Sequence, residues 1–180
     1  MRALVIYAHP VPDSFCAALR DRTVSTLQGR GWDVRLIDLY AEGFDPAMPC
    51  EERRKYNDGA PEDPLLRRHG DDLAWAEALV FVYPTWWYGL PAMLKGWLDR
   101  VWATNIAFSL PSGDGPIVTR LQHIRRIGVV TTCGATWWIS LLMGQPGRKT
   151  ILRGIRSLCA WRCRTFYLAH YSMDASTPES

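Results

Sequence analysis

The sequence lacks several features that would place it in a specialised class of protein. It has no Cys-x-x-Cys pair, and its five cysteines stand at Cys16, Cys50, Cys133, Cys159 and Cys163. An odd, scattered set argues against a disulfide framework or a zinc site and favours a reducing compartment. No apolar run approaches the roughly 18 residues of a membrane span. The apolar N-terminal run stops at His9-Pro10 without a small-residue cleavage site. We therefore expect a cytoplasmic protein with no membrane insertion and no signal peptide.

Glycine-rich phosphate-binding motifs are also missing. There is no Gly-x-Gly-x-x-Gly pattern, which counts against a dinucleotide-binding fold of the Rossmann type. The stretch GQPGRKT, residues 144 to 150, superficially suggests a Walker phosphate loop. The stretch does not match the Walker pattern, which requires glycine and lysine side by side. Arg148 separates Gly147 from Lys149, and Leu142 stands where the first glycine belongs.

Positive and negative residues are nearly balanced in number. The formal net charge of +3 is too small to indicate nucleic-acid binding, and the mixed charges of residues 51 to 55 are typical of a solvated face. A chain of 180 residues with 48% apolar and 22% charged residues can fill one hydrophobic core. We expect a single domain over residues 1 to 172, followed by a flexible tail over residues 173 to 180.

Short apolar runs alternate with helical patterns along the chain. The runs that predict strands are residues 2 to 8, 33 to 38, 77 to 83, 125 to 132 and 163 to 170. Helical spacing recurs from residue 90 to 101 and near residues 149 to 160, whereas residues 41 to 64 are typical of a long connection with at most one short helix. This alternation predicts an α/β fold with a doubly wound, five-stranded parallel sheet and helices on both faces.

A helix is predicted between the first two strands. Ser14 is a good N-cap, and Gly29-Arg30-Gly31 is typical of a helix end. From the apolar spacing we expect the side chains of Phe15, Ala18, Leu19 and Leu27 to face the core.

Ligands of such sheets bind at the carboxyl ends of the strands, so the loops that follow the first, third and fourth strands are the candidate site. The first loop leads into a helix N-terminus, where His9 and Ser14 stand beside free backbone N–H groups that suit a phosphate. The second is stiffened by Pro84 and Pro91 and carries consecutive aromatics. The third, TTCGAT at residues 131 to 136, allows close backbone approach.

A phosphate at one loop and a flat ring held between two others describe a flavin. Each loop also has a structural explanation. Ser14 can serve only as a helix cap and His9 as an ordinary loop histidine, and the tryptophans can be core or dimer-interface residues. The coincidence of three loops in this order favours the flavin.

At these residues the chain resembles the flavodoxin-like NAD(P)H:quinone oxidoreductase family, which includes quinone reductases and flavoprotein partners of potassium-efflux systems. The resemblance rests on AHPVPDSF, YPTWWYGLPAMLKGWLDRVW and TTCG, and extends over most of residues 1 to 170. It implies the flavodoxin-like version of the fold and a homodimer with each site at the subunit boundary. Carried over by position, the implied flavin-binding residues are His9, Ser14, Phe15 and Cys16 at the phosphate, Pro84, Thr85, Trp86 and Trp87 at one ring edge, and Thr131, Thr132, Cys133 and Gly134 at the other.

The chain departs from the better-known quinone reductases after the fourth-strand loop. Where those enzymes carry a tyrosine and a histidine that support charge on the reduced flavin, a gapless comparison places Ile139 and Gln145. We expect Trp137 and Trp138 to supply the missing wall by stacking.

The resemblance implies hydride transfer from NAD(P)H through bound flavin to a quinone or similar planar acceptor, without a protein nucleophile. No residue is assigned a catalytic role. We expect FMN, with FAD as the alternative, because little chain remains to wrap an adenine. A flavin- or nucleotide-sensing partner subunit of a membrane transport system is the alternative function. An electron-transfer flavodoxin is disfavoured, because those proteins are strongly acidic and this chain is slightly basic.

Overall fold

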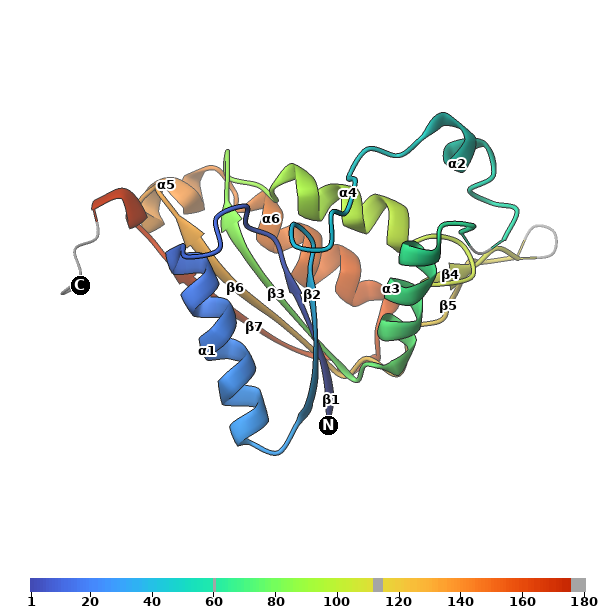
Figure 1. The fold of residues 1–180 in the computed structure, drawn as a ribbon, viewed down its shortest axis with the longest axis horizontal. Helices are drawn as coiled ribbons and strands as arrows, with labels where there is room; N and C mark the ends of the chain where they lie inside the picture. Colours follow the sequence, from blue (N-terminus) through green and yellow to red (C-terminus); the bar gives the residue numbers. More distant parts are fainter. Residues whose placement is uncertain (60, 112–114, 176–180) are drawn as a thin grey trace.

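Five parallel strands form the central sheet of the structure, a computed structural model that describes residues 1–59, 61–111 and 115–175 (Figure 1). In order across the sheet they are β2 (Asp33–Asp38), β1 (Arg2–Tyr7), β3 (Ala78–Thr85), β6 (Arg126–Cys133) and β7 (Arg164–His170). Strand order reverses between β1 and β3, so the loops that follow these two strands diverge and leave room between them. The predicted doubly wound α/β fold is confirmed, because every connection within the sheet is a long crossover between parallel strands.

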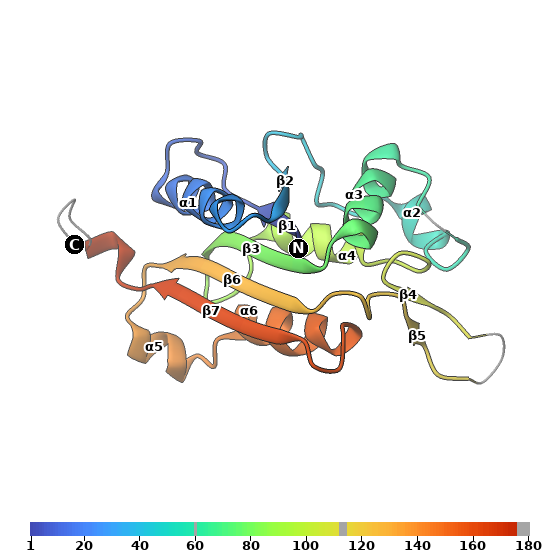
Figure 2. The same ribbon diagram turned by 90° about the horizontal axis from the view of Figure 1, so that it is seen from below.

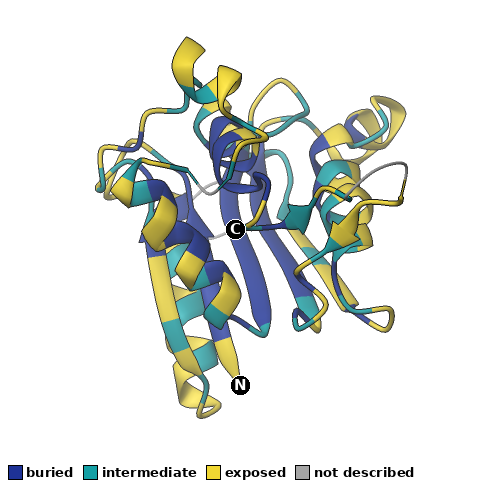
Figure 3. Cartoon of the chain, turned by 90° about the vertical axis from the view of Figure 1, so that its right-hand side faces the viewer, coloured by how far each residue is buried: buried dark blue, intermediate teal, exposed yellow. Residues whose placement is uncertain are grey.

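Helices cover both faces of this sheet unequally (Figure 2). The larger core contains side chains of α3 (Pro64–Trp75), α4 (Ala92–Val101) and the segment before β7, which pack on alternate residues of β1, β3 and β6. That segment is a composite of α6 (Pro146–Lys149), a π-helical turn η1 (Thr150–Gly154) and a 3-10 turn η2 (Ile155–Leu158). The smaller core lies under α1 (Phe15–Gly29) alone. The central strands β1, β3 and β6 are therefore buried almost throughout, as Figure 3 shows.

Helix α1 begins and ends where the sequence predicts, but a different face of it is buried. The hydroxyl of Ser14 accepts a hydrogen bond from the Ala17 N–H at 3.1 Å, as expected of an N-cap. Cys16 and Ala17 are buried against the sheet, whereas Phe15 is 42% exposed and Ala18 is also exposed. The expected burial of Phe15 and Ala18 is wrong, because the valines and Tyr7 of the strands below pack with Cys16 and Ala17 instead. Leu19 and Leu27 are partly buried and pack on this core.

The remaining elements lie outside the main sheet. The long connection after β2 holds one short helix, α2 (Cys50–Arg54), as predicted. A two-stranded antiparallel ribbon, β4 (Phe108–Ser109) with β5 (Val118–Thr119), and the helix α5 (Trp137–Leu142) complete the crossovers. After β7 the chain forms a 3-10 turn, η3 (Met173–Ala175), so part of the predicted tail is structured. Residues 176 to 180 of that tail lie outside the described residues. Within the described residues, no helix is long and apolar enough to cross a membrane.

A buried polar chain ties α3 and α4 to the loop after β2. The fully buried His69 accepts a hydrogen bond at Nδ1 from the Trp97 indole at 3.1 Å, so its Nε2 carries the proton and donates to Glu42 at 2.8 Å. Burial lowers the pKa of His69 below its ordinary value of 6.5, although the neighbouring Glu42 partly opposes this shift. The imidazole is therefore held neutral, and it fixes α4, which begins directly after the second candidate loop.

Candidate functional site

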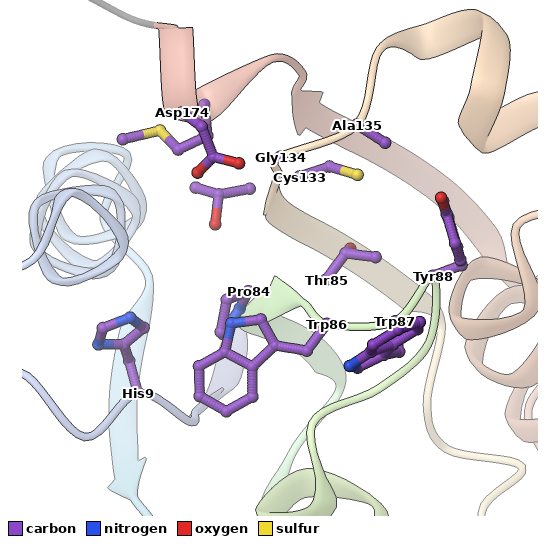
Figure 4. A pocket seen from close by; sticks show the side chains of 12 residues that line it. His9, Pro84, Thr85, Trp86, Trp87, Tyr88, Cys133, Gly134, Ala135 and Asp174 are labelled. Carbon is purple, nitrogen blue, oxygen red and sulfur yellow. The ribbon is translucent and has the colours of Figure 1, made fainter.

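An open cavity of about 740 Å³ lies at the carboxyl ends of β1, β3 and β6 (Figure 4). Three of its walls are the loops selected from the sequence, and the fourth is the segment after β7. Its lining residues are His9, Pro84, Thr85, Trp86, Trp87, Tyr88, Thr132, Cys133, Gly134, Ala135, Met173 and Asp174. A cavity of this size is in the range that small ligands and cofactors occupy.

The first wall is set by a local hydrogen bond within the loop after β1. The Nδ1 atom of His9 lies 3.1 Å from the Val11 backbone nitrogen and 3.2 Å from the Val11 carbonyl oxygen, so the ring is tied to its own loop. The imidazole lies 6.1 Å from the ring of Trp86, measured between ring centroids. His9 is thus held beside the aromatic wall.

Ser14, Phe15 and Cys16 do not line the cavity and stand at the start of α1 instead. The side chain of Phe15 packs against His170 at 5.2 Å between ring centroids. Cys16 is buried, and burial raises the pKa of its thiol to about 12. These two residues can therefore offer an anion only their backbone N–H groups, for which no protein acceptor is found among the described residues. The capping hydroxyl of Ser14 keeps those donors aligned along the helix axis.

The second wall ends in a strained aromatic turn. Strand β3 continues to Thr85, and the Gly89 N–H then donates to the Trp86 carbonyl at 3.0 Å. The two central residues, Trp87 and Tyr88, have φ angles of 48° and 62°, which define a type I′ turn that normally favours asparagine and glycine. Left-handed conformations of bulky residues cost about 1–3 kcal/mol each and concentrate at functional sites. Trp87 lines the cavity and is 92% exposed, so it lies at the solvent edge of this wall.

The third wall follows β6, and its residues have distinct roles. Thr131 is fully buried, and its Oγ1 lies 2.8 Å from Oγ1 of Thr85, so it joins the second and third loops rather than lining the cavity. Thr132 and Gly134 line the cavity directly. The thiol of Cys133 also reaches the lining, but it is buried and lies 3.3 Å from the hydroxyl of Ser140.

Four lining residues were not predicted: Tyr88, Ala135, Met173 and Asp174. Tyr88 and Ala135 adjoin predicted residues, so extending each motif by one position would have found them. Met173 and Asp174 follow β7, where no motif points to the site, and only the folded chain brings them to it.

The residues expected to replace the family tyrosine and histidine lie beside the cavity. Gln145 takes a left-handed conformation with φ of 49°, and its side-chain amide donates to the Tyr171 hydroxyl at 3.1 Å. Ile139 is exposed on α5. Trp137 and Trp138 are also exposed, with ring centroids 6.2 Å apart. These two tryptophans are not among the lining residues of the cavity in the single chain, so their stacking on a ligand stays a prediction.

The chemistry of this arrangement fits a phosphate-bearing flavin. The unpaired N–H groups at the start of α1 suit a phosphate. The aromatic side chains of the second wall and the small residues of the third suit a flat ring with polar edges. No cluster of histidine, cysteine and acidic side chains that could hold a metal is found among residues 1–59, 61–111 and 115–175.

Comparisons with known proteins agree with the flavodoxin-like fold. The model of the flavodoxin-like fold family matches residues 1–174. A guinea-pig (Cavia porcellus) NAD(P)H dehydrogenase [quinone] 1 is 32% identical over 162 residues, which cover 78% of this chain and 56% of that protein. An uncharacterized NAD(P)H oxidoreductase of Haemophilus influenzae is 38% identical over 116 residues, or 63% of this chain and 56% of that protein. A crystal structure from Streptococcus mutans superposes with a TM-score of 0.83 at 28% identity, covering 99% of this chain and 92% of that one.

The chain thus spans about half the length of the first curated relatives that it matches. The names of these relatives describe oxidoreductases. Neither name describes a sensing subunit of a transport system, so the alternative function expected from the sequence has no support from these relatives.

Proposed function

The chain belongs to the flavodoxin-like fold family, and from this premise we propose that it is a flavin-dependent oxidoreductase acting on NAD(P)H and on a quinone or similar planar acceptor. One observation carries the proposal: three loops that are distant in sequence meet around a single open cavity beside the N-terminus of α1. The NAD(P)H dehydrogenase [quinone] among its relatives supports the choice of substrates.

FMN is the proposed cofactor. Its phosphate would be held by the backbone N–H groups of Phe15 and Cys16, with Ser14 as the cap and His9 as a further donor. Its ring would lie between the segment from Pro84 to Trp87 and the segment from Thr131 to Gly134. The terminal phosphate of FMN matches a helix N-terminus directly.

The protein's part in the reaction is to bind and orient. A flavin bound here would supply the hydride chemistry between the nicotinamide and the acceptor, so no protein nucleophile is required. The backbone N–H groups near Trp87 and Gly134 would stabilise negative charge that develops on the ring. The strained turn at Trp87 and Tyr88 would hold aromatic faces beside the planar substrates and exclude water from one side.

A homodimer with the site at the subunit boundary is proposed as well. Its support is the exposure of large apolar side chains on the turn after β3 and on α5, namely Trp87, Trp137, Trp138 and Leu142. Exposed apolar side chains of this size are typical of an interaction surface. Light scattering coupled to size-exclusion chromatography should give about twice the monomer mass of 20.5 kDa. A purely monomeric protein at micromolar concentration would contradict this part of the proposal.

The test of the whole proposal is flavin binding followed by turnover. We expect the purified protein to be yellow, or to bind added FMN with quenching of tryptophan fluorescence, and mass spectrometry of the heat-released cofactor to identify FMN. The loaded protein should then oxidise NADH or NADPH in the presence of a soluble quinone. Trp86→Leu should weaken flavin binding, whereas Trp161→Leu is the matched control, because Trp161 is 88% exposed and does not line the cavity. A folded protein without flavin affinity would refute the proposal.

A further inference from the structure

The fourth wall of the cavity comes from a segment that carries no sequence motif. After β7 the chain turns at Ser172, whose φ is 55° and whose N–H donates to the Ala135 carbonyl at 3.1 Å. The Ala175 N–H then donates to the Ser172 carbonyl at 2.9 Å and closes the short turn η3. The first of these hydrogen bonds attaches the segment to the third loop and the second shapes the turn, and together they hold Met173 and Asp174 at the cavity.

The carboxylate of Asp174 rests directly over Gly134. A Cβ atom built on Gly134 would lie 3.2 Å from Cγ of Asp174 and would clash with its Oδ2, so the absence of a side chain at Gly134 makes room for the carboxylate. Figure 4 shows the Asp174 carboxylate beside Gly134, where it points into the cavity. Among the described residues, no hydrogen bond or ion pair to this carboxylate is found.

Asp174 also dominates the charge of the cavity. No lysine, arginine or glutamate is among the described lining residues, and Asp174 is their one acidic side chain. The remainder of the lining is aromatic, aliphatic or neutral polar, apart from His9, whose Nδ1 contacts the Val11 backbone. A ligand in this cavity therefore meets one negative charge that no lysine or arginine of the described lining offsets.

We propose that Asp174 is a specificity-determining residue that makes the cavity select uncharged or cationic planar acceptors over anionic ones. This inference rests on the proposed function, because it concerns the acceptor of the same site. A carboxylate can only accept hydrogen bonds, so it favours ring edges with N–H or O–H donors and disfavours sulfonates and carboxylates. Because the side chain is exposed at the mouth of the cavity, its field is partly screened by water and salt.

The expected effect follows from Coulomb's law. A ligand charge about 6 Å from the carboxylate, at an effective dielectric constant of about 40–80, changes the affinity by about three- to tenfold. The effect should decrease as salt is added, because the Debye length falls to about 3 Å at 1 M.

The test uses two probes with the same ring system, anthraquinone sulfonate and hydroxymethyl anthraquinone, and measures binding rather than turnover. Each is titrated into FMN-loaded protein, or into the protein as purified if no flavin binds, with tryptophan fluorescence as the readout. The quantity compared is the ratio of the dissociation constant of the anionic probe to that of the neutral probe. Asp174→Asn should lower this ratio about three- to tenfold at low salt. Asp71→Asn is the control, because Asp71 is exposed on α3, does not line the cavity, and changes the net charge equally.

Each outcome supports or overturns the proposal. A ratio that falls in Asp174→Asn alone, and less so at high salt, supports it. An unchanged ratio in Asp174→Asn, or an equal fall in Asp71→Asn, overturns it, as does a wild-type protein that binds neither probe. A failure of the proposed function is separate, because it shows as missing flavin affinity or missing NAD(P)H oxidation, neither of which enters the ratio.

Discussion

Replacing Ser14 by aspartate tests the position of the cofactor phosphate without disturbing the fold. The Ser14 side chain caps α1 by accepting a hydrogen bond from the Ala17 N–H. Aspartate is an equally good N-cap, so helix α1 and the stability of the protein should be preserved. The substitution adds one negative charge beside the N–H groups of Phe15 and Cys16, where we place the phosphate.

The size of the effect can be worked out from charge and distance. A phosphate monoester carries about −1.5 to −2 charges at pH 7. One carboxylate about 5 Å away raises its energy by about 1 kcal/mol at a dielectric constant of about 80 and by about 5 kcal/mol at about 20. A middle value of about 2 kcal/mol weakens FMN binding about thirtyfold.

The assay compares FMN with riboflavin, which has the same ring but no phosphate. Dissociation constants are measured by fluorescence titration for the wild type, Ser14→Asp and the neutral control Ser14→Asn. FMN affinity should fall about thirtyfold in Ser14→Asp and change little in Ser14→Asn, whereas riboflavin affinity should stay within about twofold in both. Thermal unfolding of the flavin-free proteins checks that the cap is intact.

Two results would refute this reasoning. Unchanged FMN affinity in Ser14→Asp would mean that the phosphate does not bind at α1. An equal loss of FMN and riboflavin affinity would mean that the substitution disturbs the loop rather than repelling a phosphate.

Three further predictions concern chemistry and stability. Cys133→Ser should keep at least about half of the NAD(P)H oxidation rate, because hydride transfer to flavin uses no thiol; loss of turnover with flavin still bound would contradict this. The free energy of unfolding should decrease as the pH falls below about 6.5, because the unfolded chain protonates His69 more readily than the folded one, in which burial lowers its pKa. His69→Gln should flatten that dependence in denaturant titrations at several pH values, and an equal slope in both proteins would exclude His69 as its source. Gly96→Ala should destabilise the protein by about 1–3 kcal/mol, because the new Cβ would lie 2.6 Å from Cα of Pro46. An unchanged denaturation midpoint would contradict this, since it would mean that the loop at Pro46 moves aside without loss of stability.

The sequence by itself determined the fold class and three walls of the cavity. Buried parallel strands show as continuous apolar runs, and the Ser14 cap depends on residues within one helical turn. Such signals are local, so a single sequence carries them. The same holds for the aromatic turn after β3, whose proline, tryptophan and glycine pattern lies within a few adjacent residues.

Only the tertiary structure decided the features that depend on residues distant in sequence. The face that α1 buries is set by the side chains of the strands beneath it, so Phe15 lies outside the core although it is apolar. Thr131 became a link between loops because Thr85 lies near it at the end of the neighbouring strand. Asp174 reaches the cavity because a backbone hydrogen bond from Ser172 ties its segment to the loop after β6. Contacts of this kind join elements through the sheet order, which periodicity along the chain does not encode.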